Sequence, residues 1–184
     1  MSQTSLFKYC QLAFLSRPAD ERAIYRLMAK QKPRRILEIG LGLGVRSLRM
    51  FEVAGRYCDS EQISYTGIDA FEARPADAAT FSMKAAYKLL RQQGVKVKLV
   101  PGATLAAMTM TANSLANTDF IVIDAAIRDK DLEKAWKYFP RMMHEDSIIL
   151  RQRADGEGNL LETLKLADVR QRIELQSNAV VKAA

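Results

Sequence analysis

The stretch Ile36-Leu-Glu-Ile-Gly-Leu-Gly-Leu-Gly44 decides the fold. Its first residues form an almost continuous apolar run, which is typical of a strand covered on both faces. Gly40, Gly42 and Gly44 let the backbone turn sharply and let a ligand approach the main chain. A helix then starts near Val45, and its free N–H groups face the same place. This strand–turn–helix unit predicts a ligand site, and a tight connection without a ligand is the alternative.

Strands and helices alternate on both sides of this unit. Strands that alternate with helices of about 10 to 18 residues indicate βαβ units. We therefore expect a doubly wound, mostly parallel α/β sheet. The expected strands are Arg34–Ile39, Ser64–Asp69, Val95–Val100, Asp119–Asp124 and Ser147–Arg151, and the expected helices include Ala19–Lys30, Ala76–Gln93, Thr104–Ala116 and Lys130–Met142.

The length of 184 residues and the 48% share of hydrophobic residues fit one domain. Residues 1–16 read as an N-terminal arm that packs on the domain or on a second subunit, so a homodimer is one expected state. Residues 17–33 hold a helix, 34–152 the core, and 153–184 a C-terminal helix and strands. In this last part we expect a helix over Leu160–Ala167 and short strands over Val169–Leu175 and Ala179–Lys182.

The cysteines and the apolar runs indicate where in the cell we expect the protein. Cys10 and Cys58 form no metal-ligand pattern, and no signal peptide precedes them. The longest apolar runs are far shorter than the roughly 20 residues that span a bilayer. We expect a cytoplasmic protein with free thiols and no membrane partner.

Five segments resemble, in order, the motifs of class I S-adenosylmethionine-dependent methyltransferases. The acidic-x-Gly-x-Gly-x-Gly pattern is similar to their first motif, and the others are similar to their second to fifth strands. The closest group is that of the small catechol- and caffeoyl-type O-methyltransferases. The resemblance implies a seven-stranded Rossmann-like sheet, here with a shortened C-terminal hairpin. The segments are Glu38–Gly44, Tyr65–Asp69, Gln93–Leu105, Thr118–Ala125 and His144–Leu150.

The same resemblance implies S-adenosylmethionine as the cofactor and methyl transfer to a small-molecule acceptor as the activity. Asp69 would accept hydrogen bonds from the ribose hydroxyls, a task that suits a carboxylate. Asp124 would point into the site as a cofactor contact and candidate catalytic residue. The implied cofactor contacts are Glu38, Gly40, Gly42, Gly44, Asp69, Ala70, Phe71, Gly102, Ala103 and Asp124.

The chain departs from these O-methyltransferases where they bind a divalent cation. In that group the Asp at the position of Asp124 and an Asp-Asn pair after the fifth strand are the ligands, but Arg151 and Gln152 stand at the pair. An arginine cannot bind a hard cation. We therefore expect no metal. Arg151 and Arg153 are instead candidates for binding an acidic substrate, with surface pairing to acidic residues of the following loop as the alternative.

Three other functions stay open. A relative that binds the cofactor without turnover is one. An NAD-type Rossmann protein is another, because a dinucleotide fingerprint counted from Gly42 places Ser47 at its third position. The third is a nucleic-acid methyltransferase, because the formal net charge is +7. However, Lys96 and Lys98 alternate with apolar residues, which is typical of an edge strand that lysines protect from unwanted pairing.

Two further features read as structural. His144 is the only histidine, but it starts the fifth strand and so belongs to the edge opposite the glycine turn. Trp136, Tyr138 and Phe139 lie near the end of a helix, where core or subunit contacts are expected.

Overall fold

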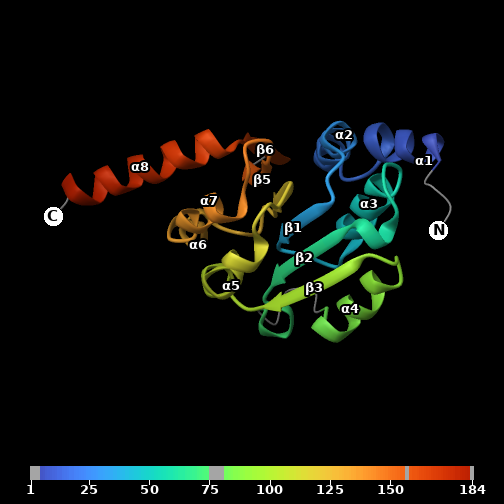
Figure 1. The fold of residues 1–184 in the computed structure, drawn as a ribbon, viewed down its shortest axis with the longest axis horizontal. Coiled ribbons are helices and arrows are strands. Elements are labelled where there is room, and N and C mark those ends of the chain that lie inside the picture. The colour runs from blue at the N-terminus through green and yellow to red at the C-terminus, as the bar shows by residue number, and fades with distance from the viewer. Residues whose placement is uncertain (1–4, 75–80, 156–157, 183–184) are drawn as a thin grey trace.

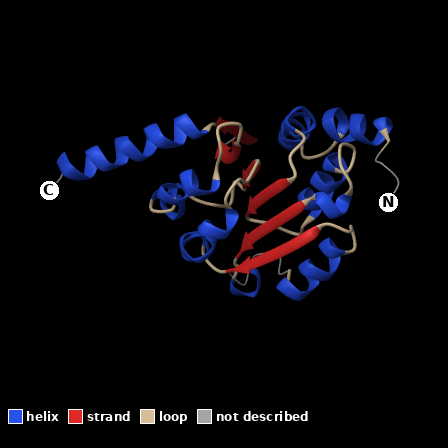
Figure 2. Ribbon diagram, viewed as in Figure 1, coloured by secondary structure: helices blue, strands red, loops and turns tan. Residues whose placement is uncertain are grey.

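The computed structural model describes residues 5–74, 81–155 and 158–182. Within them the chain forms one six-stranded sheet with helices on both faces (Figures 1 and 2). The strand order is β3-β2-β1-β4-β5-β6; the first five strands are parallel, and β6 is antiparallel to β5. The strands are β1 Arg35–Ile39, β2 Ser64–Asp69, β3 Lys96–Pro101, β4 Phe120–Ile123, β5 Ile148–Asp155 and β6 Gly158–Leu164.

This topology confirms the doubly wound, mostly parallel sheet, with six strands instead of seven among the described residues. The five predicted strands all form. Four of them agree with the expected ends to within one residue, and β5 extends four residues further than expected, to Asp155. The α-helices are α1 Leu6–Cys10, α2 Arg22–Gln31, α3 Val45–Ala54, α4 Met83–Arg91, α5 Thr104–Thr111, α6 Asp129–Glu133, α7 Phe139–Met142 and α8 Leu166–Lys182. Short 3-10 helices cover Ala19–Glu21, Ser60–Gln62, Phe71–Ala73, Ala112–Leu115 and Trp136–Tyr138.

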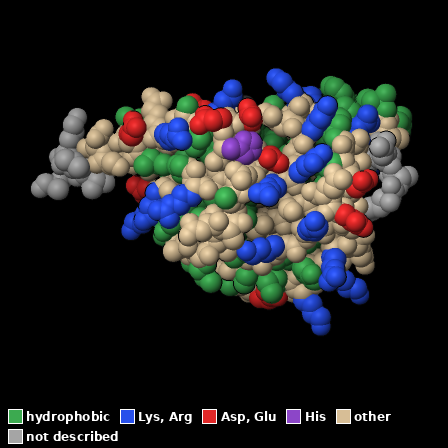
Figure 3. All heavy atoms as spheres, in the orientation of Figure 1, with side chains coloured by type: hydrophobic (Ala, Val, Ile, Leu, Met, Phe, Trp, Pro, Cys, Tyr) green, Lys and Arg blue, Asp and Glu red, His purple; other side chains and the backbone are tan. Residues whose placement is uncertain are grey.

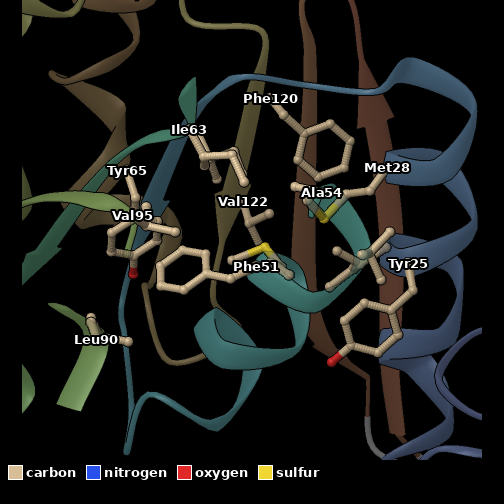
Figure 4. Packing of buried hydrophobic residues seen from close by; sticks show 14 of the residues in the cluster. Tyr25, Met28, Phe51, Ala54, Ile63, Tyr65, Leu90, Val95, Phe120 and Val122 are labelled. Atoms are coloured by element: carbon tan, nitrogen blue, oxygen red, sulfur yellow. The ribbon is translucent and has the colours of Figure 1, made fainter. Parts of the chain in front are cut away.

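Two apolar clusters cover the two faces of the sheet. One joins α2, α3 and α4 to the sheet, and its members include Tyr25, Phe51 and Tyr65 (Figure 4). The other joins α5, α6, α7 and α8 to the opposite face. Because side chains alternate along a strand, Ile36 packs in the first cluster and Leu37 in the second. The buried pattern of β1 follows from this two-sided cover.

The expected structure of the C-terminal part was wrong. Gly158–Leu164 forms a strand instead of a helix, because it pairs antiparallel with β5 along its whole length. One long helix, α8, replaces the two expected strands. Val169 and Ile173 lie four residues apart and pack together on the second cluster, a contact that a helix allows. Beyond them α8 extends away from the body (Figure 1).

Three expected helices are shorter than the pattern indicated. The one expected over Thr104–Ala116 ends at Thr111 and continues as a 3-10 helix. The helix expected over Lys130–Met142 is broken into α6, a 3-10 turn and α7. Pro140 lies in this segment; it has no N–H and cannot continue a helix from the preceding turn. The helix expected over Ala76–Gln93 begins at Met83 with Ser82 as its cap, and residues 76–80 lie outside the described part.

The N-terminal arm forms α1 and a π-helical turn over Gln11–Leu15. Leu12 and Ala13 are buried. Phe7, Phe14 and Leu15 are exposed. The arm therefore packs on the domain through one face and leaves an apolar face outside.

Strand β3 lies at one edge of the sheet, as its lysines predict. Lys96 and Lys98 are exposed, whereas Val97 and Leu99 are half-buried. Figure 3 shows Lys and Arg side chains distributed over one face, with Asp and Glu between several of them. Among the described helices, none combines the length and the apolar composition needed to cross a bilayer.

Candidate functional site

The carboxyl ends of the parallel strands border a cavity of about 770 Å³, here called the strand-end cavity. Open α/β sheets bind ligands at this edge, where the loops after neighbouring strands diverge. The volume lies within the range of small-molecule sites. Its walls come from the turn after β1, the ends of β2 and β3, the loop after β4, and α6. The lining residues are Gly40, Gly42, Leu43, Ile68, Asp69, Ala70, Arg74, Gly102, Ala103, Thr104, Leu105, Asp124, Ala126, Ile127, Arg128, Lys130, Asp131 and Lys134.

The glycine turn brings its main chain against the neighbouring strands. Gly40, Gly42 and Gly44 have φ values of 87°, 59° and 77°, which residues other than glycine rarely adopt. Gly40 N–H donates to the Ile68 carbonyl at 2.8 Å. A Cβ at Gly40 would lie 2.7 Å from the Cβ of Asp124, whereas one at Gly42 would meet nothing within 4 Å. Gly40 therefore packs the strand ends together, and Gly42 leaves space for a ligand.

Asp69 ends β2 at the cavity with both carboxylate oxygens engaged. It accepts from Leu41 N–H at 2.7 Å and from Phe71 N–H at 2.9 Å. Arg74 donates to both oxygens, from Nε at 2.8 Å and from Nη2 at 2.5 Å, and also bonds the Gly42 carbonyl. Burial alone would raise the pKa of Asp69, but the Arg74 bonds and the two N–H donors outweigh it and hold the pKa below its usual value.

Arg46 occupies the centre of a buried polar network below the glycine turn. Its Nε donates to Glu38 at 2.7 Å, its Nη2 to the Gly40 carbonyl at 2.7 Å, and its Nη1 to Asp124 at 2.7 Å and Gln152 at 2.6 Å. Its side chain is 7% exposed. Burial would lower the pKa of Arg46, but the two carboxylates raise it above its usual value, so the guanidinium stays charged. One side chain from α3 thus joins the ends of β1, β4 and β5.

Glu38 is fully buried and lies behind the turn. It points to the same face of β1 as Ile36, toward α3 and β2. Besides Arg46, it accepts hydrogen bonds from Ser47 and from the Tyr65 hydroxyl, each at 2.5 Å. Burial, and then the Glu38 charge and hydrogen bond, raise the pKa of Tyr65 well above its usual value, so Tyr65 remains a donor.

Asp124 follows β4 and faces the cavity with a side chain that is 27% exposed. One carboxylate oxygen accepts from Arg46, and the other accepts from Ala126 N–H at 2.9 Å. The second bond fixes the turn after β4. Asp124 therefore both caps this turn and presents a carboxylate to the cavity.

The structure brings most of the predicted cofactor contacts to one place. Seven of the ten line the cavity, namely Gly40, Gly42, Asp69, Ala70, Gly102, Ala103 and Asp124. Glu38, Gly44 and Phe71 are not among the lining residues; Glu38 and Phe71 are fully buried. Phe71 adopts a φ of 46°, and its N–H contacts Asp69.

Sequence reasoning missed Arg46, Arg74 and Tyr65, and it read Gln152 only as a lost metal ligand. One signal for Arg46 was available. Arg46 is the second residue of the helix that follows the glycine turn, close to the expected ligand site, and a charged side chain that is buried there needs a partner. Ser47, read as a fingerprint position, is buried and bonded to Glu38. No comparable pattern marks Arg74.

Arg151 and Arg153 lie beside the strand-end cavity and do not line it. Both pair with Asp129 at the start of α6. The acidic side chains of the following loop, which were the alternative partners, lie outside the described part of the chain. The Arg153–Asp129 distance is 2.8 Å. With Trp136 and Arg172 they line a second hollow of about 470 Å³, here called the arginine hollow.

His144, Trp136 and Phe139, for which structural roles were predicted, lie away from the strand-end cavity's lining. The His144 ring lies 3.0 Å from Asp119, whose other oxygen accepts from the N–H groups at the start of β1. It therefore lies at the amino end of the sheet, as predicted. Trp136 and Phe139 are buried in the second cluster with ring centroids 4.9 Å apart.

Within residues 5–74, 81–155 and 158–182, no group of three or more His, Cys, Asp or Glu side chains is placed to hold a metal ion. Asp124 faces the positive charge of Arg46 instead of a second carboxylate.

Comparison with known proteins places the fold. No protein-family model and no curated protein matches the chain. Solved structures do match. The O-methyltransferase TomG from Streptomyces achromogenes, involved in tomaymycin synthesis and solved with SAM, has a TM-score of 0.57 at 17% identity, over 92% of this chain and 76% of that one. A putative caffeoyl-CoA O-methyltransferase from Staphylococcus aureus has a TM-score of 0.53 at 16% identity, over 99% and 83%.

An O-methyltransferase from Bacillus cereus, solved with SAH, has a TM-score of 0.56 at 16% identity, over 87% of this chain and 69% of that one. At these identities the likeness concerns the fold. The chain has the fold of the class I methyltransferases, and the resemblance read from its motifs is confirmed at that level.

Proposed function

We propose that the protein is an S-adenosylmethionine-dependent methyltransferase that acts on a small-molecule acceptor without a metal. One observation carries the proposal: the strand-end cavity is lined at once by the glycine turn, by Asp69, by Gly102–Ala103 and by Asp124. These are the positions that the motifs assign to the cofactor. The SAM and SAH complexes of the structural neighbours support the same ligand.

The lining residues fit this cofactor. Gly42 leaves the space beside the turn open. Asp69 would supply the carboxylate for the ribose hydroxyls once Arg74 releases it, and Gly102–Ala103 would lie beside the adenine. Glu38 acts as a positioning residue, because it reaches the site only through Arg46, Ser47 and Tyr65.

Arg46 supports a reaction without a metal. Its Nη1 lies between Asp124 and Gln152 and already supplies a positive charge to two of the positions at which related O-methyltransferases bind a cation. A divalent ion there would face a guanidinium at close range, which is strongly unfavourable. Arg151, at the remaining position, has no oxygen to offer.

The chemistry needs little from the protein beyond alignment. When bound, the cofactor would supply a methyl group attached to a sulfonium sulfur, and neutral S-adenosylhomocysteine would be the leaving group of an in-line displacement. The chain's own residues position the acceptor, and an oxygen acceptor must also lose a proton. Asp124 is the carboxylate that faces the cavity from the end of β4, so we assign it the proton, with its charge held in place by Arg46 and Ala126 N–H.

A relative that binds the cofactor without turnover is the second candidate. The observation that favours it lies on the acceptor side: Arg151 stands at a position of the lost metal pair, and Asp124 is already bonded to Arg46. The exposed thiol of Cys10 and the free thiol of Cys58 support a reducing compartment such as the cytoplasm for either function.

Calorimetric titration of the protein with S-adenosylmethionine, S-adenosylhomocysteine and NADH tests the proposal. We expect binding of the first two and weaker binding of NADH. Absence of binding to both sulfur compounds at millimolar concentration would refute the proposal, and tighter NADH binding would select the NAD-type alternative.

Turnover is tested with an assay for released S-adenosylhomocysteine over a panel of hydroxylated small molecules and nucleic acids. Binding without any turnover would select the non-catalytic relative. Turnover on nucleic acid, with an affinity that falls steeply with salt, would select the nucleic-acid enzyme.

A further inference from the structure

The arginine hollow lies next to the strand-end cavity, beside the middle of β5. Lys130 lines both, so the two spaces adjoin along α6. Its other lining residues come from α6, β5, the turn around Trp136, and α8. They are Asp129, Glu133, Trp136, Arg151, Arg153, Arg172 and Gln176.

A carboxylate already occupies the centre of this cluster. One oxygen of Asp129 contacts Arg151, and the other contacts Arg153 at 2.8 Å. Two guanidinium groups that share one carboxylate form a site of matched shape and charge for such a group. The carboxylate belongs to the protein, but its position shows what chemistry the two arginines accept.

Asp129 is held less firmly than the arginines it contacts. Asp129 is the first residue of the five-residue helix α6, and its side chain is 63% exposed. The Arg151 side chain is 4% exposed and comes from the middle of β5. Exposed ion pairs contribute little to stability. A ligand carboxylate can therefore exchange with Asp129 while the buried Arg151 guanidinium stays in place.

The cluster carries more positive than negative charge. Lys130, Arg151, Arg153 and Arg172 face Asp129, Glu133 and Glu162. The buried Nε of Arg151 has no hydrogen-bond partner in the described part of the chain. Burial, followed by the charge of Arg153, lowers the pKa of Arg151. An added anion would offset this excess.

We propose that the arginine hollow binds a carboxylate group of the methyl acceptor, which takes the place of Asp129 between Arg151 and Arg153. Its role for the acceptor rests on the proposed function, since the reacting end would extend past Lys130 into the strand-end cavity. The acceptor class is then a small carboxylic acid that also carries a hydroxyl group.

Trp136 gives the test a direct signal. It is the only tryptophan of the chain, and the guanidinium of Arg172 lies 4.6 Å from its ring centroid. Titration with malonate, which is transparent at the wavelengths used, is followed by Trp136 fluorescence at constant ionic strength, with NaCl as the reference. We expect a saturable change with malonate that NaCl does not produce.

Three variants sharpen the test. Asp129→Asn removes the internal competitor and should tighten malonate binding by about fivefold. Arg153→Met, at a side chain that is 44% exposed, should weaken it by about fivefold or more without unfolding the chain. Arg170→Met removes an exposed arginine of α8 that pairs with Glu145, and it should leave binding unchanged.

The outcomes separate this inference from the proposed function. Equal responses to malonate and NaCl, or an Asp129→Asn variant that binds no tighter, would overturn the carboxylate site. Calorimetry with S-adenosylhomocysteine on the same proteins is independent of Trp136, and the three variants should bind it as the wild type does. Malonate binding without any S-adenosylhomocysteine binding would keep the anion site but overturn its role for a methyl acceptor.

Discussion

Replacing Arg46 by Met tests the network below the glycine turn. The substitution removes four hydrogen bonds and one buried charge while keeping an unbranched apolar stem. Asp124 lies at the cavity and can turn to water. Gln152 is buried and keeps its hydrogen bond to Asp20, whereas Glu38 is fully buried and keeps only Ser47 and Tyr65 as donors. Loss of one partner of a buried ion pair costs about 3–5 kcal/mol, so we expect a loss of that size in the free energy of unfolding.

Urea unfolding followed by far-ultraviolet circular dichroism measures this loss. With a slope of about 2 kcal/mol per molar urea, the midpoint should fall by about 2 M. The Glu38→Gln, Arg46→Met double variant is the matched control, because a neutral amide no longer leaves a buried charge alone. It should recover at least about 1 kcal/mol relative to Arg46→Met. A loss below about 1 kcal/mol in the single variant would refute the reasoning.

Three other predictions follow from the walls of the strand-end cavity. Arg74→Ala removes the guanidinium from both oxygens of Asp69 and should tighten S-adenosylhomocysteine binding by about tenfold in calorimetry; unchanged or weaker binding would show that Arg74 does not compete with the ribose. Gly42→Ala should lower the free energy of unfolding by about 1–2 kcal/mol because of its φ of 59°, and its Cβ should block binding of S-adenosylhomocysteine. Gly40→Ala should lose at least about 1 kcal/mol more, because its Cβ would lie 2.7 Å from that of Asp124. Equal urea midpoints for the two variants would contradict this. Because the pKa of Asp69 is lowered in the folded state, its contribution to stability is complete above the unfolded carboxyl pKa of about 4 and disappears as the pH falls through the lower folded value. The stability difference between wild type and Asp69→Asn should therefore shrink below about pH 4, and a difference that stays constant to pH 2 would argue against the depressed pKa.

The central sheet was predictable because its strands are apolar on both faces. Residues 120–123 are all apolar and all buried. A run of this kind fits a strand with both faces covered better than a surface helix or an exposed strand, in which some positions would be polar. The cavity-lining residues followed from the same pattern, since the end of each strand places its next residue at one edge. Asp69 and Asp124 were located in this way.

The partners of these residues were not predictable in the same way. Arg46 bonds to Gln152 across 106 positions of sequence, a contact that only the completed sheet creates. The C-terminal part failed for a related reason. The choice between helix and strand in residues 158–164 depends on pairing with β5, and tertiary contacts override local preference.

The two sides of the strand-end cavity differ in how well they tolerate substitutions. The glycine turn and the ends of β1, β4 and β5 depend on one another through a single guanidinium, so most substitutions there disturb several strands at once. The opposite wall consists of the loop after β4 and the five-residue helix α6, with exposed lysine and aspartate side chains. Mutations can accumulate in that wall at small cost to folding. The evolution of a new acceptor specificity in this protein would therefore begin on α6 and leave the base of the cavity unaltered.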